Sequence, residues 1–384
     1  MKSVLFINYE YPPVGAGGAT ACHQFATRFA ARGTKTVVLT SAFRNRRGTS
    51  TEEGVTVCRI PSGRKRAAQS SLLQMFTFVV MAVFTLPRIL RTQRPDLTII
   101  FFAFPCGPLG VLLQLIWKLP YVIMLRGSDV PGSEPSLDKI HRALRPVRRI
   151  VYRNSSALIA NSNGLRRIAL RSDPDIAVEV VPNGVDTDFF RPHAGASQTA
   201  DHQFTFLFAG RICVQKNLVM LIEAFAQCRA SRRNCRLVMI GEGPELAHLR
   251  REVHARSLDA AVQWTGWCTR EVLRSYYQSA DCFVCPSINE GMSNAILEAM
   301  ACGLAVLASD CPGNRDIVVE GKSGYLFTIT DSSALSERMV QYVSEPSPCY
   351  EQGRFARTLT CERFSWNSSA RMLHSLIRNR APYR

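Results

Sequence analysis

The sequence predicts an α/β protein with two doubly wound domains, each a largely parallel sheet flanked by helices. Both halves of the chain alternate short apolar segments with longer helical ones, which is typical of parallel strands joined by crossover helices. Residues 191–202 are polar and interrupt this alternation, so we expect a domain linker near 186–203. A length of 384 residues, 46% of them apolar, suits two domains with separate cores.

The first half opens with a buried strand over residues 2–8, a glycine-rich loop over 9–18 and a helix over about 19–31. The glycines let the backbone approach a ligand closely. A dinucleotide-binding domain would carry an acid near the end of the second strand, and residues 40–44 contain none. Strands are expected at 36–40, 96–102, 121–125, 157–160 and 178–181.

Residues 72–86 form an apolar segment with basic residues on both sides, at 64–66 and at Arg88, Arg91 and Arg94. At about fifteen residues it is short for a membrane span, which needs about twenty. It is either a buried helix of the domain or a helix lying among lipid headgroups, where Leu72, Phe76, Val79, Val83 and Phe84 would insert.

Residues 139–153 form a basic helical segment with six Lys and Arg. Ile140, Leu144, Val147 and Val151 are spaced as one apolar stripe, and Pro146 is expected to kink or divide the helix. The basic face either meets solvent or contacts anionic lipid.

The second half repeats the alternation, with strands expected at 204–209, 236–240, 262–266, 280–285 and 304–308. Arg211 and Lys216 follow the first of these strands. Two cations there suit a diphosphate, which Arg binds as a fork and Lys as a point charge. The alternative is a pair of solvated loop cations.

The stretch 286–303 carries the strongest chemical signal, because it predicts a strand end, a loop and a helix. Ser293 or Asn294 caps the helix, and Gly303 ends it. Glu290 lies in the loop and Glu298 on the second turn. The helix N-terminus suits a phosphate, and the two carboxylates suit hydroxyl groups on either side of it, as in a nucleotide sugar. The alternative is a capped surface helix with two solvated glutamates.

The distribution of charge along the chain indicates which classes of partner the protein could bind. Residues 1–190 carry 25 Lys and Arg against 12 Asp and Glu, whereas residues 191–384 carry 22 against 18. The basic half suits an anionic membrane or an acidic substrate. No nucleic-acid-binding motif accompanies it, so we expect no nucleic acid partner.

Thirteen scattered cysteines and no recognisable signal peptide favour reduced thiols inside a cell. Cys282 and Cys285 point to opposite faces of a strand, so we expect buried thiols rather than a zinc site.

Taken together, these motifs resemble the retaining glycosyltransferases of family 4, also called glycosyl transferases group 1, over nearly the whole chain. The motifs that carry the resemblance are Gly17-Gly18, Pro-Asn-Gly-Val-Asp at 182–186, Gly210-Arg211 with Lys216, Gly-Glu-Gly-Pro at 241–244, and Glu290 with Glu298. The resemblance implies the GT-B fold, in which two Rossmann-like domains face a central cleft. It also implies domains at 1–190 and 191–365, with a helix at 366–384 that crosses back to the first domain.

The resemblance further implies a nucleoside-diphosphate sugar as donor, held mainly by the second domain. Arg211 and Lys216 would hold the diphosphate, with Gly210 also among the donor-binding residues. Glu298 would hold the ribose hydroxyls, and Glu290 would contact the donor sugar. The backbone of Gly291, Met292, Ser293 and Asn294 would donate to the phosphate or sugar. Gly17 and Gly18 would approach the donor from the first domain.

One position departs from the family pattern. Many members have a His-Gly pair after the strand that ends at Leu125, and here the pair is Arg126-Gly127. Arginine cannot act as a base, but Arg126 could stabilise charge on the leaving diphosphate. We expect retention at the anomeric carbon, with Arg126, Arg211, Lys216 and Glu290 in the catalytic set. The resemblance implies no metal and no cofactor.

The function that this resemblance implies is sugar transfer to a lipid-linked or polysaccharide acceptor in cell-envelope or exopolysaccharide synthesis. We expect a cytoplasmic protein that is peripheral at the inner face of the membrane. Two alternatives remain open: a GT-B-type sugar-nucleotide epimerase, and a non-catalytic membrane-associated protein that binds a sugar nucleotide.

Overall fold

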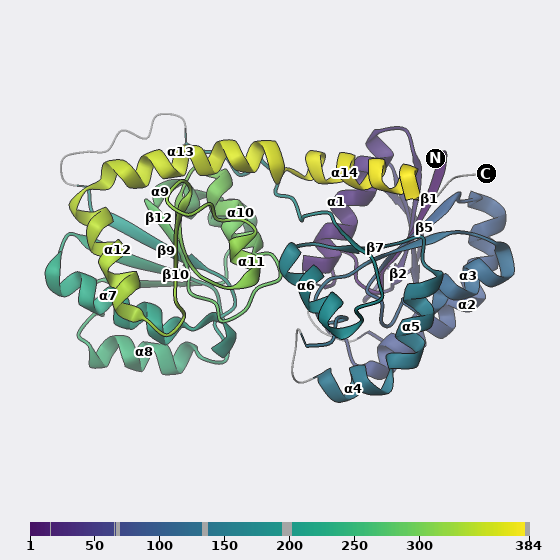
Figure 1. Ribbon diagram of the computed structural model, residues 1–384, viewed down its shortest axis with the longest axis horizontal. Coiled ribbons are helices and arrows are strands. Elements are labelled where there is room, and N and C mark those ends of the chain that lie inside the picture. The colour runs from purple at the N-terminus through teal and green to yellow at the C-terminus, as the bar shows by residue number, and fades with distance from the viewer. Residues whose placement is uncertain (16, 65, 67–69, 133–136, 194–201, 381–384) are drawn as a thin grey trace. The chain divides into compact units, whose positions relative to one another are not determined.

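The computed structural model describes residues 1–384 except 16, 65, 67–69, 133–136, 194–201 and 381–384. The chain divides into two compact units (Figure 1). Unit 1 comprises Met1–Asn183 and Trp366–Arg384, and unit 2 comprises Gly184–Ser365. The linker predicted near 186–203 falls at the start of unit 2, and its residues 194–201 lie outside the described residues, as does Lys65 of the predicted basic flank.

Unit 1 is built on an eight-stranded sheet in the order β3-β4-β2-β1-β5-β6-β7-β8. All neighbours pair in parallel except β3 and β4. The central β1 is buried on both faces, and its Phe6 pairs with Val38 on one side and Ile99 on the other. The strands are β1 Ser3–Ile7, β2 Lys35–Ser41, β3 Gly48–Glu52, β4 Val55–Ile60, β5 Leu97–Phe101, β6 Tyr121–Met124, β7 Ala157–Ala160 and β8 Val178–Val180.

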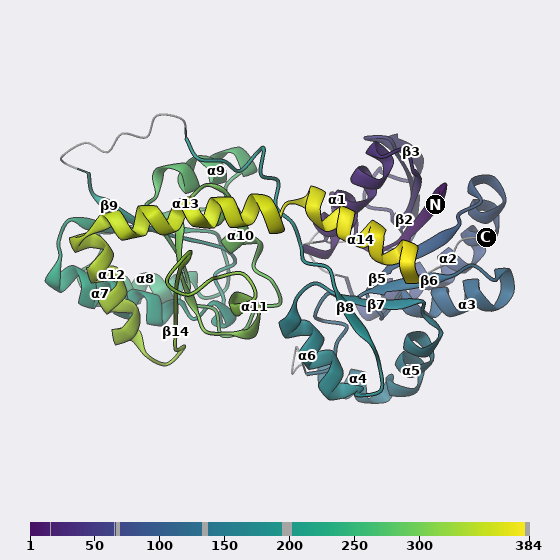
Figure 2. The same ribbon diagram turned by 45° about the horizontal axis from the view of Figure 1, so that its top comes forward.

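The helices of unit 1 pack on the two faces of this sheet around one apolar core. The last helix of the chain belongs to this unit and lies beside α1 in both ribbon views (Figures 1 and 2). Trp366 at its start meets Phe25 of α1 edge to face at 5.5 Å. The helices are α1 Gly17–Ala31, α2 Leu72–Gln93, α3 Gly107–Trp117, α4 Asp138–Ala143, α5 Arg145–Asn154, α6 Asn163–Ser172 and α14 Trp366–Arg380.

Helix α2 is longer than the sequence predicted, and the expectation of about fifteen residues was wrong. It has 22 residues and continues past Pro87, because Leu86 and Ile89 both pack into the core. Among the described residues it is the one helix long and apolar enough to cross a membrane. Its buried stripe is held against the sheet, whereas Leu73, Phe76 and Phe84 are 73%, 66% and 76% exposed. The prediction of a wholly buried helix is therefore also wrong.

The basic segment 139–153 is divided into α4 and α5, with Pro146 in the first turn of α5. This break shifts the helical phase, so the predicted apolar stripe is not continuous. Val151 is buried as expected, but Val147 is 42% exposed. Arg148 turns inward instead and donates to the buried Asp173 carboxylate at 2.9 Å.

Unit 2 contains a fully parallel six-stranded sheet in the order β11-β10-β9-β12-β13-β14. Apolar clusters cover both faces of this sheet. The strands are β9 Phe204–Ala209, β10 Cys235–Ile240, β11 Val262–Gly266, β12 Cys282–Cys285, β13 Ala305–Ser309 and β14 Gly324–Phe327. The helices are α7 Leu218–Ser231, α8 Leu246–Ala255, α9 Arg270–Ser279, α10 Asn294–Ala301, α11 Pro312–Arg315, α12 Ser332–Ser344 and α13 Pro346–Arg363, with a 3-10 turn at Val214–Lys216.

Parallel sheets between layers of helices thus form both units, as the sequence predicted. Because all strands of the unit 2 sheet run in parallel, the loops after β9, β10, β11 and β12 meet at one sheet edge. Three of the predicted motifs fall on these loops or on the helix that follows β12, namely Gly210-Arg211 with Lys216, Gly-Glu-Gly-Pro at 241–244, and Glu290 with Glu298. Cys282 and Cys285 are buried free thiols on β12, as expected.

Candidate functional site

Lys216 and Glu290 form an ion pair at the carboxyl edge of the unit 2 sheet, with 2.5 Å between Nζ and Oε1. Two further bonds join their loops, because the Ile288 N–H donates to the Gln215 carbonyl and the Gln215 side chain donates to the Asn289 carbonyl, each at 2.9 Å. Burial lowers the pKa of the Lys216 ammonium, but the adjacent Glu290 carboxylate offsets this, and the net pKa is raised. The cation predicted for the diphosphate is therefore fully charged and held by the carboxylate predicted for the sugar.

Gly210 and Gly241 bring two loops of this edge into backbone contact. A Cβ on Gly241 would lie 1.9 Å from the Gly210 carbonyl oxygen, and the φ of Gly241 is +131°. Both features require glycine at this position. The Gly210 N–H donates to the Ile240 carbonyl at 3.0 Å. Gly210 and Gly241 both line the cavity described below, together with Arg211.

Helix α10 begins as predicted, with Ser293 as its N-cap. The Ser293 hydroxyl accepts from the Ile296 N–H at 3.4 Å, and the first turn carries no acidic residue. Met292 packs into the core, so its side chain is not available to a ligand. The first turn therefore carries the positive end of the helix dipole, as expected for an anion site.

Glu298, on the second turn of α10, is held by Tyr277 of α9. The Tyr277 hydroxyl donates to Oε2 at 3.2 Å. Burial raises the pKa of the Glu298 carboxyl to about 7, although Tyr277 and Arg270 both act to lower it. Glu298 is thus a half-buried acid. Any further hydrogen-bond donor, such as a ligand hydroxyl, would stabilise its ionised form.

A cavity of about 480 Å³ lies at this edge of the sheet, and among the described residues Lys216 and Glu290 are not part of its lining. Four of the predicted residues line it, namely Gly210, Arg211, Asn294 and Glu298. Its remaining lining is largely apolar and comes from the ends of β9 and β10, the loops after β10 and β11, and helices α9 and α10. The residues that sequence reasoning missed there are Glu242, Trp267, Cys268, Leu273 and Tyr277. Glu242 stood in the quoted Gly-Glu-Gly-Pro motif, but no local pattern marked the others.

Gly291 lies in the loop between β12 and α10, and the remaining predicted residues belong to unit 1. Gly17 and Gly18 begin α1, and a Cβ on Gly18 would lie 2.6 Å from the Phe102 ring. Their proposed contact with the donor stays a prediction. Gly18 is needed in any case because the helix start packs against that ring.

Arg126 follows β6 and stacks on an aromatic ring. Its guanidinium carbon lies 4.5 Å from the Phe101 ring centre, and Nη1 donates to Asn183 Oδ1 at 2.7 Å. Burial lowers the pKa of this guanidinium to about 10, so it remains charged at neutral pH. Within the described part of the chain, Nε and Nη2 have no hydrogen-bond partner. The predicted role at a leaving diphosphate stays a prediction.

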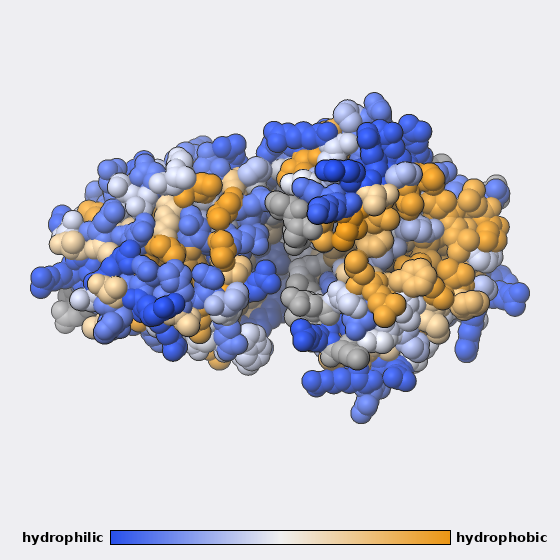
Figure 3. All heavy atoms as spheres, turned by 90° about the horizontal axis from the view of Figure 1, so that it is seen from below, coloured by the Kyte–Doolittle hydropathy of each residue, from blue (hydrophilic) through white to orange (hydrophobic). Residues whose placement is uncertain are grey.

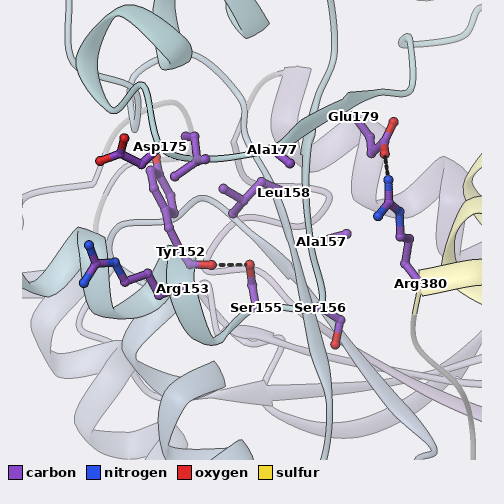
Figure 4. A pocket seen from close by; sticks show the side chains of 11 residues that line it. Tyr152, Arg153, Ser155, Ser156, Ala157, Leu158, Asp175, Ala177, Glu179 and Arg380 are labelled. Carbon is purple, nitrogen blue, oxygen red and sulfur yellow. Dashed lines mark hydrogen bonds and ion pairs between the residues drawn. The ribbon is translucent and has the colours of Figure 1, made fainter.

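A second cavity, of about 310 Å³, lies in unit 1 at the amino ends of β7 and β8 (Figure 4). The ion pair of Glu179 with Arg380, at 2.6 Å, stands on one side of it, and Ser155 bonds to the Tyr152 carbonyl on the other. None of the predicted site residues line this cavity. It also lies at the sheet edge opposite to Arg126, so we do not include it in the candidate site.

Comparison with known proteins identifies the family. Residues 191–358 match the family model "Glycosyl transferases group 1", and residues 16–184 match the "Glycosyl transferase 4-like domain". The chain is 30% identical over 286 residues to the alpha-maltose-1-phosphate synthase of Mycolicibacterium smegmatis, covering 68% of this chain and 73% of that one. It is 26% identical over 298 residues to a lipopolysaccharide 1,2-N-acetylglucosaminetransferase of Salmonella typhimurium, covering 68% and 78%.

The fold is similar to that of Anabaena HepE, solved in complex with UDP and glucose. The TM-score is 0.75 at 18% identity, over 99% of this chain and 100% of that one. Three observations indicate the same family: the two parallel α/β units, the matches to both family models, and the similarity to named transferases. The chain therefore belongs to the glycosyl transferases group 1 family and is a glycosyltransferase of the GT-B class.

Proposed function

We propose that the protein moves a sugar from a nucleoside-diphosphate sugar to a lipid-linked or polysaccharide acceptor, with retention at the anomeric carbon. The observation that carries the proposal is the arrangement around the unit 2 cavity. Arg211, the first turn of α10 and Glu298 line it, and the Lys216–Glu290 ion pair lies on the loops after β9 and β12 at the same sheet edge. A nucleotide sugar has a matching order of groups, with a diphosphate between two hydroxyl-bearing rings.

In this proposal Glu298 accepts hydrogen bonds from the ribose hydroxyls, and Arg211 and Lys216 bind the diphosphate beside the start of α10. Glu290 then contacts the donor sugar. Lys216 already forms an ion pair with Glu290. When the donor binds, the Lys216 ammonium would therefore interact with both the Glu290 carboxylate and the diphosphate. Support also comes from HepE, a protein of the same fold that was solved with UDP and glucose.

The catalytic step that these residues can assist is departure of the nucleoside diphosphate. Its leaving oxygen gains negative charge as the bond to the anomeric carbon breaks, and preorganised cations and N–H groups stabilise such charge. Arg211, Lys216 and the α10 N-terminus supply positive charge where many transferases use Mg²⁺. We therefore propose metal-independent transfer. Chelation with EDTA should leave the rate unchanged, and a loss of activity restored by Mg²⁺ would overturn this part of the proposal.

Product analysis tests the reaction directly. The protein is incubated with UDP-, GDP- and ADP-sugars, with and without a membrane-lipid extract. The proposal requires a glycosylated lipid or glycan and release of the nucleoside diphosphate, with the anomeric configuration of the donor kept in the NMR spectrum of the product. An altered free sugar nucleotide would instead indicate an epimerase. Binding without turnover in every mixture would indicate a non-catalytic protein, and an inverted product would refute retention.

We also propose that the enzyme is cytoplasmic and peripheral at the inner face of a membrane. Support comes from an exposed apolar face of unit 1, formed by three neighbouring helices, α2, α3 and α5. Figure 3 shows apolar surface gathered on the side of the molecule that carries unit 1. The apolar face consists of Leu72, Leu73, Phe76, Val80, Val83 and Phe84 on α2, Leu115, Ile116 and Trp117 on α3, and Val147 and Ile150 on α5.

The apolar face carries basic residues on the same three helices, which suits the boundary of an anionic bilayer. Arg88 and Arg91 continue the exposed stripe of α2, Lys118 follows α3, and Arg145 and Arg153 flank the stripe of α5; all five are exposed. Each such residue contributes about 1 kcal/mol near an anionic leaflet. Because the buried stripe of α2 is part of the unit 1 core, we expect the helix to lie in the interface rather than to span the membrane.

Vesicle co-sedimentation tests this contact. Anionic vesicles should bind the protein at low salt, and part of the binding should persist at high salt, because inserted apolar groups are not screened. Phe76→Asp together with Phe84→Asp should abolish the salt-resistant part. Phe355→Asp, at a half-exposed phenylalanine of unit 2, is the matched control and should bind like the parent. No binding of the parent to anionic vesicles at low salt would refute the membrane proposal and favour a soluble acceptor.

A further inference from the structure

The turn that follows β13 packs against the loop that carries Glu290. β12 and β13 are neighbouring parallel strands, and Cys285 at the end of β12 pairs with Ala308 near the end of β13. The segment after β12, residues 286–293, carries Glu290, and the segment after β13 leads into α11. The described residues 309–316 do not line the unit 2 cavity. This turn therefore acts on a ligand there only through its neighbours.

Ser309, the last residue of β13, holds the start of the Glu290 loop through buried hydrogen bonds. Its hydroxyl donates to the Ser287 carbonyl at 2.5 Å. The Asn314 side chain of α11 donates to the carbonyl and hydroxyl oxygens of Ser309, at 3.0 and 3.1 Å. Ser287, Ser309 and Asn314 are all fully buried, so no solvent competes for these bonds. The start of the Glu290 loop is thereby fixed to the end of β13.

Gly313, in α11, approaches the same loop closely at Glu290 itself. A Cβ on Gly313 would lie 2.3 Å from the Glu290 carbonyl oxygen and 2.6 Å from the Gly291 carbonyl oxygen. Both distances are far shorter than a van der Waals contact, so any side chain here would displace the loop. The φ of Gly313 lies outside the left-handed region. Glycine is therefore needed at this position for space and not for backbone conformation.

Glu290 is held from the opposite side by the loop after β9. The sheet order β9-β12-β13 places the Glu290 loop between these two neighbours. On the β9 side, Lys216 Nζ lies 2.5 Å from Glu290 Oε1, and the Gln215 side chain donates to the Asn289 carbonyl at 2.9 Å. On the β13 side, Ser309 and Gly313 make the contacts described above. A short ion pair tolerates little displacement, so a shift of the loop on the β13 side would change the position of the carboxylate.

We propose that Ser309 and Gly313 are positioning residues that hold Glu290 where it contacts the donor sugar, an inference that rests on the proposed function. Neither residue needs to touch the donor. Arg211 and Glu298 lie on other elements and would still bind the nucleotide part if the Glu290 loop moved. The turn after β13 therefore affects binding of the sugar more than binding of the nucleotide.

Calorimetric titration of the full-length protein tests this with three pairs of ligands: UDP and UDP-glucose, GDP and GDP-mannose, ADP and ADP-glucose. Gly313→Ala should weaken the sugar nucleotide about tenfold, the value of one charge-assisted hydrogen bond, and Ser309→Ala should weaken it in the same direction. The free nucleotide should bind both variants like the parent. Gly353→Ala is the matched control, because its Cβ would lie 2.1 Å from the Gly303 carbonyl oxygen, at the other end of β13 from Glu290. It should bind both ligands like the parent.

A double-mutant cycle distinguishes positioning of Glu290 from a merely structural role. If Ser309 and Gly313 act through Glu290, adding Ser309→Ala or Gly313→Ala to Glu290→Ala should weaken the sugar nucleotide no further, whereas independent damage would add. Ser309→Ala introduces no new atoms, so it keeps the test available if Gly313→Ala does not fold.

Three results would overturn the positioning role while the proposed function stands. They are unchanged binding of the sugar nucleotide in both variants, equal weakening of the free nucleotide and the sugar nucleotide, and full additivity with Glu290→Ala. If none of the six ligands binds the folded parent, the proposed function itself fails, and the positioning role fails with it.

Discussion

The pKa of Glu298 makes donor affinity depend on pH in a way that can be worked out from the structure. With a pKa of about 7, the carboxyl is about nine-tenths ionised at pH 8 and about one-tenth ionised at pH 6. The ionised form accepts charge-assisted bonds from the ribose hydroxyls. Such bonds exceed neutral ones by about 1.4 kcal/mol, or about tenfold in affinity.

Weighting the two forms by their populations gives a loss of about fivefold in donor affinity from pH 8 to pH 6. The assay is calorimetric titration with an intact UDP- or GDP-sugar. Its diphosphate is esterified at both ends and does not titrate in this range, whereas the terminal phosphate of a free nucleotide has a pKa of about 6. Any pH dependence then comes from the protein.

Glu298→Gln should bind the donor more weakly than the parent at pH 8 and should show no such pH dependence. Glu337→Gln, at an exposed glutamate of α12, is the control and should behave like the parent at both pH values. Equal parental affinity at pH 6 and pH 8, or a Glu298→Gln variant that binds as tightly as the parent, would refute the ribose role.

Three further predictions concern unit 2. Arg211→Ala or Lys216→Ala should each lower kcat/KM at least about tenfold, since each removes a charge-assisted contact of roughly 1.5–3 kcal/mol; unchanged kinetics in both folded variants would contradict the diphosphate assignment. Glu298→Gln should gain thermal stability relative to the parent as the pH rises from 5 to 8. Burial raises the native pKa above its unfolded value, so the parent loses stability across this window, and a constant difference in Tm would be inconsistent with a buried acid. Gly241→Ala should destabilise unit 2 by at least about 2 kcal/mol, because its Cβ would overlap a carbonyl oxygen and its φ is positive; a denaturation midpoint equal to that of the parent would disprove the contact.

The sequence predicted best those features that depend on local chain chemistry. The start of α10 follows from the cap at Ser293, and its end follows from Gly303, which has a φ of +86°. The parallel strands of both sheets followed from runs of apolar residues that only a doubly covered sheet can bury. Lys216 and Glu290 were both expected at the site, and their direct pairing is compatible with the predicted roles.

Features that depend on tertiary packing were predicted poorly. The segment 72–86 has apolar residues nearly all round, so periodicity could not tell which stripe of α2 faces the sheet. The hairpin of β3 and β4 was not predicted, since its first strand is polar and exposed. Tyr277 and Trp267 reach the cavity from helices and loops that are distant in the sequence from Glu298, and no spacing rule connects them.

The central claim is that the carboxyl edge of the unit 2 sheet binds a nucleoside-diphosphate sugar through Lys216 and through Glu298 in the cavity. The most direct measurement is calorimetric titration of the parent, Lys216→Ala and Glu298→Gln with a panel of UDP-, GDP- and ADP-sugars at pH 8. We predict that at least one donor binds the parent at a single site and binds each folded variant about tenfold more weakly or worse. The claim would be contradicted if both variants bound the donor with the same affinity as the parent, or if no donor bound the parent.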